Sequence, residues 1–171
     1  MVVLRRTKKL AAALPISTPV SADSTTALGD WYVNRLTVDR RPLLLLVSAR
    51  SLLPLLIPAR EVARLPDRLP ELVAARLRRL GVPPSVVQAE IGAMQPVLVG
   101  PTADRSVLGI MVDFAKGVPF HLGPGAWDDT TLAFVEAQLA ETPCHASGRF
   151  EDVIFPDRKA PELLLARWGA G

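Results

Sequence analysis

Residues 43–48, with the sequence LLLLVS, limit the possible folds of this chain more than any other segment. A strand with one solvated face alternates apolar and polar residues, and this run does not alternate, so we expect it to be buried on both faces. Strand-like runs at 31–38 and 52–57 flank it, with a turn at Asp39-Arg40-Arg41-Pro42. We therefore predict an antiparallel β-meander with helices on both sides, and Pro54 favours an edge position for its third strand.

The rest of the chain supplies the helices. Pro70 suits a first helical position and Gly81 a C-terminal cap, which predicts a helix over 69–80. Asp104 suits the N-cap of a helix with an apolar stripe at Val107, Ile110, Met111, Phe114 and Ala115. Further helices are expected at 8–14 after Thr7, at 84–94, at 130–141 after Asp128 and Asp129, and at 162–168; short strands are expected at 2–6 and 97–99.

These elements predict an α+β fold with a small antiparallel meander packed against four or five helices. The 171 residues suit a single globular domain over 1–171. We expect a loop at 117–125 and a tail from 146 that is irregular apart from its short helix.

The segment 42–59 is long and apolar, but Arg50 lies at its centre, and Pro54 and Pro58 interrupt it. A charge at the middle of a bilayer is costly, so two buried strands are expected there and no membrane span. The charged N-terminus does not resemble a signal peptide. Cys144 is the only cysteine, which excludes an intramolecular disulfide and favours a reducing, cytoplasmic location.

The net charge of +3 conceals two halves of opposite sign. Residues 1–80 hold 14 basic and 6 acidic residues, and residues 81–171 hold 6 basic and 11 acidic residues. One interpretation is that the halves pair with each other or with a second copy. The other is a basic face that meets phosphate or an acidic protein.

Familiar catalytic motifs are missing from the sequence, and we expect no catalytic residue, cofactor or metal. His121 or His145 could approach Cys144 to form a nucleophile and base, and a zinc site could add Asp128 and Asp129 to these three residues. The irregular spacing makes a small buried thiol the simpler interpretation.

The helix after Asp104 carries a charged stripe opposite its apolar face. Arg105, Gly109 and Asp113 are spaced four residues apart, and Lys116 lies near the end of the stripe. A glycine within a helix costs about 1 kcal/mol relative to alanine, which suggests a close approach at Gly109. Either another element packs there while Arg105 and Asp113 form ion pairs, or the stripe is a shallow site where Arg105 grips an anion.

A second candidate surface is basic. If the first strand joins the sheet, cations near the strand and the hairpin turn could form one patch beside Trp31 and Tyr32, a combination that suits nucleic acid. A solvated rim is the alternative, because residues of a strand alternate between faces. The patch would comprise Arg5, Arg6, Lys8, Lys9, Arg40 and Arg41.

Four segments carry a resemblance to a known family: LRRTKKL at 4–10, LGDWYVNRLTVDRR at 28–41, RSVLGIMVDF at 105–114 and LAETPC at 139–144. Together they resemble an uncharacterised bacterial domain family, a domain of unknown function whose relatives are associated with plasmid-type open reading frames. The resemblance covers about residues 1–145 and implies a shared fold without an assigned activity. It also implies small polar residues where this chain has Ile110 and Val112. The positions that match are Thr7, Asn34, Arg105, Gly109 and Asp113.

The leading hypothesis is a non-enzymatic binding or regulatory module of the bacterial cytoplasm that recognises another macromolecule, a protein partner or a second copy. One alternative is a small-molecule binding protein or enzyme that holds a phosphate-bearing or acidic ligand near Arg105 and Asp113. The other is nucleic-acid binding through the basic N-terminal half.

Overall fold

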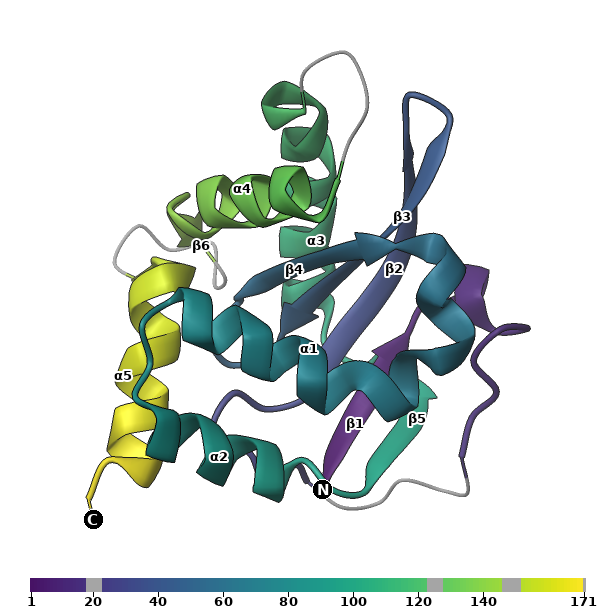
Figure 1. Cartoon of the computed structure of the whole chain (residues 1–171). Helices are drawn as coiled ribbons and strands as arrows, with labels where there is room; N and C mark the ends of the chain where they lie inside the picture. The colour runs from purple at the N-terminus through teal and green to yellow at the C-terminus, as the bar shows by residue number, and fades with distance from the viewer. Residues whose placement is uncertain (18–22, 123–127, 146–151, 171) are drawn as a thin grey trace.

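The structure, a computed structural model, describes residues 1–17, 23–122, 128–145 and 152–170. Its centre is a five-stranded mixed sheet in the order β4-β3-β2-β1-β5 (Figure 1). β2, β3 and β4 form the predicted antiparallel meander, and β1 lies parallel between β2 and β5. The strands are β1 (Val2–Arg6), β2 (Trp31–Val38), β3 (Arg41–Ser48), β4 (Pro54–Pro58) and β5 (Val97–Pro101), and β6 (Cys144–His145) and β7 (Val153–Ile154) form a separate hairpin.

Helices cover both faces of this sheet, so the chain has an α+β fold. Figure 1 shows α1 in front of the sheet and α3 behind it. In β3, Leu44 and Leu46 belong to the core on the α1 side, and Leu45 to the core on the α3 side. The expected burial of this strand on both faces is therefore confirmed. The helices are α1 (Leu65–Arg79), α2 (Pro84–Ala93) and α5 (Pro156–Trp168) on one face, and α3 (Arg105–His121) and α4 (Asp129–Ala140) on the other.

The predicted start of the first long helix is wrong. α1 begins at Leu65, directly after the 3-10 helix η2 (Ala59–Arg64), and Pro70 lies inside it. Leu65 and Leu69 are both fully buried, so packing against the sheet favours the additional turn despite the proline. The other end is as expected, because Gly81 adopts a φ of 78° just beyond the helix.

The helix after Asp104 is confirmed but is longer than expected. The Asp104 carboxylate accepts a hydrogen bond from the Ser106 N–H at 2.8 Å and caps α3. The helix continues to His121, so the loop predicted from residue 117 is wrong as far as residue 121. Val118 is fully buried and extends the apolar stripe by another turn. Residues 123–125 of that predicted loop lie outside the described residues.

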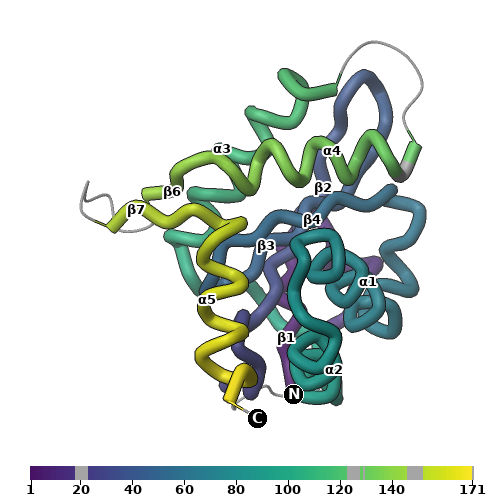
Figure 2. Tube along the Cα trace, turned by 60° about the vertical axis from the view of Figure 1, so that its left-hand side comes forward, coloured from purple at the N-terminus to yellow at the C-terminus, as the bar shows by residue number. Residues whose placement is uncertain are grey.

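Two other helices also differ in extent from the prediction. The expected helix at 8–14 is reduced to the 3-10 turn η1 (Lys8–Leu10), and the Thr7 side chain makes no capping hydrogen bond. α5 begins at Pro156, six residues earlier than expected, and its Ala160 and Leu164 are fully buried. α5 contacts α2, and Figure 2 shows both helices in the lower half of the molecule, near the two labelled termini. None of the helices in the described part of the chain is long and apolar enough to cross a membrane.

Candidate functional site

The charged stripe of α3 is exposed along its length, at Arg105, Gly109, Asp113 and Lys116. Apart from its own helix, a Cβ atom built on Gly109 would meet no atom within 4 Å, so the expectation that another element packs against this glycine is wrong. A close approach occurs one turn beyond Asp113, where a Cβ on Gly117 would lie 3.2 Å from a methyl group of Leu139 in α4. The expected ion pairs are also wrong, because neither Arg105 nor Asp113 makes one with any described residue.

The stripe does not act as one site, because α3 separates its members. Lys116 lines a groove between α3 and β2, together with Asn34. Asp113 lines a smaller pocket on the other flank of the helix, together with Cys144. Arg105 lines neither cavity.

The space between β2 and α3, which we call the β2–α3 groove, has a volume of about 450 Å³ and is open to solvent. Its walls come from η1, β2 and α3, with Leu45 contributed by β3. Three lining residues are cationic, namely Lys9, Arg35 and Lys116, and none of the lining residues is acidic or aromatic. The remaining lining residues are polar or aliphatic: Asn34, Thr37, Leu36, Val38, Leu45, Leu108, Met111, Val112, Ala115 and Pro119.

The outer edge of this groove carries unusual apolar exposure. Val112 is 53 % exposed, and Phe120, two turns further along α3, is 87 % exposed. Lys116 lies between them on the same side of the helix. Large apolar side chains in this position leave part of the helix surface without an intramolecular partner.

Thr7 and Asn34, two of the positions of the family resemblance, meet beside this groove. The Thr7 hydroxyl donates to Asn34 Oδ1 at 2.7 Å, and the Arg35 N–H donates to the same oxygen at 2.8 Å. Because a backbone N–H can only donate, the atom facing it must be the amide oxygen. The Asn34 amide nitrogen therefore points the other way, and it has no partner among the described residues.

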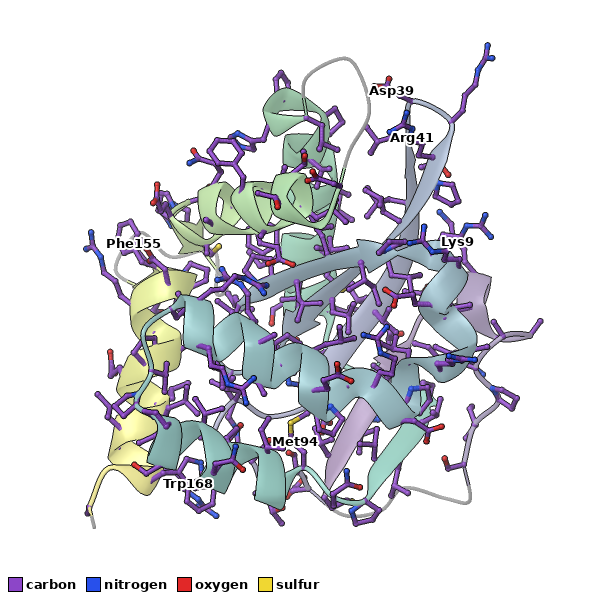
Figure 3. All side chains as sticks on the ribbon, in the orientation of Figure 1. Lys9, Asp39, Arg41, Met94, Phe155 and Trp168 are labelled. Carbon is purple, nitrogen blue, oxygen red and sulfur yellow. The ribbon has the colours of Figure 1, made fainter. Side chains whose placement is uncertain are left out.

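The cations proposed as one basic patch are dispersed. Arg5 pairs with Asp30 at 2.9 Å, and Arg6 donates to the Leu14 carbonyl at 2.8 Å. Figure 3 shows Arg41 near the tip of the β2–β3 hairpin and Lys9 well away from it, nearer the body of the sheet. Lys8 is exposed, and Arg40 occupies the hairpin turn with a φ of 64°.

The aromatic side chains expected beside that patch are not accessible. Trp31 is 1 % exposed and Tyr32 is 3 % exposed. The Tyr32 hydroxyl accepts a hydrogen bond from the Asp104 N–H at 2.9 Å, so it is committed to the start of α3. The predicted surface for stacking nucleic-acid bases is therefore wrong.

The smaller pocket, of about 170 Å³, brings together Asp113, His121, Cys144 and His145. Cys144 is buried, and its burial, with a further contribution from the charge of Asp113, raises the pKa of the thiol to about 11. A nucleophilic cysteine needs the opposite shift, so the structure argues against the Cys/His enzyme. Among the described residues no group of three or more side chains is placed to hold a metal ion. Asp128, the remaining proposed zinc ligand with a described side chain, caps α4 and lines a different cavity.

A buried charge cluster that the sequence analysis missed lies between α1, α4 and β4. The Glu136 carboxylate lies 3.5 Å from Arg76 and 2.8 Å from Arg79, and it accepts the Leu56 N–H at 2.8 Å. Burial raises the pKa of Glu136 and lowers that of Arg76, which is the direction that desolvation gives to each. The available signal was a lone acidic residue on the apolar face of α4.

Comparison with curated proteins and with solved structures gives no match. A family model matches residues 3–159, which is most of the chain and extends into α5. The chain therefore belongs to the family described as domain of unknown function DUF6933.

Proposed function

We propose that this protein is a non-enzymatic binding module that holds an acidic segment of another protein chain in the β2–α3 groove. The observation that supports the proposal is the composition of the groove, where every charged lining residue is a cation and the other walls are largely aliphatic. Such a surface attracts negative charge and also offers apolar contact. The exposed Val112 and Phe120 enlarge the apolar part of this surface.

The same composition disfavours the alternative ligands. Single-stranded nucleic acid is held by aromatic stacking as well as by cations, and the groove has no aromatic lining residue. A small anionic ligand at Arg105 and Asp113 would need these residues in one cavity, and they do not share one. The raised pKa of Cys144 disfavours a cysteine nucleophile. A cytoplasmic location continues to rest on the single cysteine.

The test uses two fluorescein-labelled decapeptides with blocked ends, one of alternating Glu and Val and one of alternating Lys and Val. We expect fluorescence anisotropy to show saturable binding of the Glu–Val peptide only. Lys116→Glu should weaken it about tenfold or more, because the substitution reverses a charge on the groove wall. Arg78→Glu is the matched control, since Arg78 is exposed on α1, on the other face of the sheet.

Equal binding of both peptides, or binding that Lys116→Glu leaves unchanged, would overturn the proposal. Two further measurements test the nucleic-acid hypothesis: retention of the protein on heparin, and displacement of the bound peptide by single-stranded DNA. Retention on heparin that falls steeply with salt, together with displacement of the peptide by DNA, would favour that hypothesis instead.

A further inference from the structure

The β2–β3 hairpin projects beyond the strand that flanks it, as Figure 1 shows. β2 extends to Val38, but the parallel pairing with β1 ends where Arg6 meets Val33. The Asn34–Val38 part of β2 therefore has β3 on one side and no neighbouring strand on the other. This overhang forms one wall of the β2–α3 groove.

The geometry of the hairpin determines which backbone groups face the open side. The turn has two residues, Asp39 and Arg40, both with positive φ, so Val38 and Arg41 form the hydrogen-bonded pair that closes the hairpin. Hydrogen-bonded and non-hydrogen-bonded pairs alternate along an antiparallel ladder. The backbone groups of Arg35 and Thr37 therefore point away from β3. Val33 belongs to the same alternating set as Arg35 and Thr37. The Thr7 N–H donates to the Val33 carbonyl at 3.1 Å, which confirms that the backbone groups of this set point away from β3.

Only one of the outward groups on the overhang has a partner. The Arg35 N–H donates to the side chain of Asn34. The Arg35 carbonyl and both polar backbone groups of Thr37 make no hydrogen bond to any described residue. Both residues are exposed and line the groove.

The two outer edges of the sheet are closed by comparison. On β4, Pro54 and Pro58 have no N–H, and the Leu56 N–H is bound by Glu136. On β5, Val99 exchanges hydrogen bonds with Ser17, through its N–H to the serine oxygen and its carbonyl to the serine N–H, both at 3.0 Å. Within the described residues, the overhang of β2 is thus the part of the sheet where a further strand has room and partners.

We propose that the acidic segment binds as an added β-strand along Arg35–Thr37, in line with the end of β1. The inference rests on the proposed function and specifies its geometry. The added strand would satisfy the Arg35 carbonyl and the two backbone groups of Thr37, and these bonds would supply affinity independent of sequence. Alternate side chains would then face α3, where aliphatic Val112, cationic Lys116 and the free Asn34 amide donor select apolar and acidic residues.

The decisive experiment is a scan of single N-methyl groups along the Glu–Val decapeptide, with the unmodified protein. In a strand, successive N–H groups point to opposite sides, and the overhang offers two open acceptors, the carbonyls of Arg35 and Thr37. Methylation should therefore weaken binding about tenfold or more at two positions that lie two residues apart, and have little effect at the position between them. Amide hydrogen exchange should show new protection of the Thr37 N–H in the complex. Thr37→Pro removes that donor and should weaken binding. Thr37→Val is the matched control, because it keeps the N–H and should leave binding unchanged.

The outcomes separate the two proposals. If methylation weakens binding at no position while Lys116→Glu still weakens it about tenfold or more, the groove is the site and strand addition is wrong. If the unmethylated peptide does not bind at all, the proposed function fails first. If the overhang instead binds a second copy of the chain, the Thr37 N–H would be protected from exchange without peptide, the protection would rise with protein concentration, and sedimentation would show self-association. This result would also overturn the inference. The methylated peptides require no protein variant, so the test does not depend on whether Thr37→Pro folds.

Discussion

At the scale of single residues, glycines in and beside helices have different effects on stability. Gly109 lies in the middle of α3 with open space around its missing Cβ, so nothing compensates for its low helix propensity. Gly81 follows α1 with a φ of 78°, a conformation that other residues adopt only with strain. Replacement by alanine should therefore raise the free energy of unfolding at Gly109 and lower it at Gly81.

We predict that Gly109→Ala stabilises the protein by about 0.5–1 kcal/mol and that Gly81→Ala destabilises it by about 1 kcal/mol. Urea denaturation followed by circular dichroism measures both free energies of unfolding. A destabilised Gly109→Ala protein with unchanged binding would contradict the open environment that the structure gives this glycine.

Cys144 provides a second test at this scale. With a pKa of about 11, its thiol should react with iodoacetamide at pH 8 about a hundredfold more slowly in the folded protein than in urea, because only the thiolate reacts. Asp113→Asn removes the neighbouring charge and leaves the burial, so it should lower the pKa in part. The free energy of unfolding should fall as the pH rises from about 9 to about 11, since unfolding then releases the proton. A native rate at pH 8 equal to the denatured rate would refute the assignment.

Residue-level inference from the sequence succeeded where the cause was local. Asp104 caps α3 because its side chain reaches an N–H two residues away, which the sequence alone reveals. The prediction at Gly109 is wrong because low helix propensity indicates an energetic cost but does not identify a neighbouring element. Glu136 was missed because its partners, Arg76 and Arg79, are about sixty residues away in the chain and meet it only through packing.

At the scale of elements, the edge strand β4 is covered by side chains as well as interrupted by prolines. Glu136 binds the Leu56 N–H, and Arg76 donates to the Pro54 carbonyl at 3.3 Å. The carboxylate and the guanidinium also lie close to each other. The buried ion pair therefore joins α1 and α4 across the strand and closes an edge that could otherwise pair with another chain.

We predict that Glu136→Ala lowers the free energy of unfolding by about 3–5 kcal/mol, because it leaves a buried Arg76 without its counter-charge and a buried Leu56 N–H without an acceptor. Glu71→Ala is the matched control. Glu71 is 74 % exposed and lies 3.7 Å from Arg68, so its removal should change stability by less than about 0.5 kcal/mol. Denaturant titration compares the two, and equal losses would show that the buried cluster has no special role.

The extents of the elements show which information the sequence holds. The type of β3 and its double burial follow from its composition, and its two-residue hairpin turn lies within the predicted turn segment. The start of α1 and the length of α3 do not follow from the local sequence. Burial of Leu65 and Val118 outweighs the tendency of Pro70 and Pro119 to end a helix. The β2–α3 groove likewise depends on where β1 ends beside β2, which no local pattern indicates.

At the scale of the whole molecule, the opposite charges of the two halves meet at one buried place. Glu136 belongs to the acidic half, and its partners Arg76 and Arg79 belong to the basic half. Four further ion pairs join groups within the same half, as in Arg5 with Asp30. The cations of the β2–α3 groove are therefore not neutralised by ion pairs within the described part of the fold.

The C-terminal helix is part of this whole and not a separate appendage. Leu164 and Ala160 are fully buried in the core on the α1 side. The Trp168 indole N–H donates to Glu90 at 2.7 Å, and the same buried carboxylate accepts the N–H groups of Ala27 and Leu28. The end of the chain thus stabilises the segment that leads into β2.

We predict that truncation after residue 155 destabilises the protein by at least about 3 kcal/mol, from the lost burial of Leu164 and the lost hydrogen bond to Glu90. Trp168→Phe isolates the second contribution, because it keeps an aromatic ring and removes the donor; its cost should be about 1–3 kcal/mol. Leu165→Ala, at a side chain that is 48 % exposed on the same helix, is the control and should have a smaller effect. Thermal and urea denaturation measure all three variants. A truncated protein with unchanged stability would instead make residues 1–155 an independent unit, and peptide binding in the β2–α3 groove should then survive the truncation unchanged.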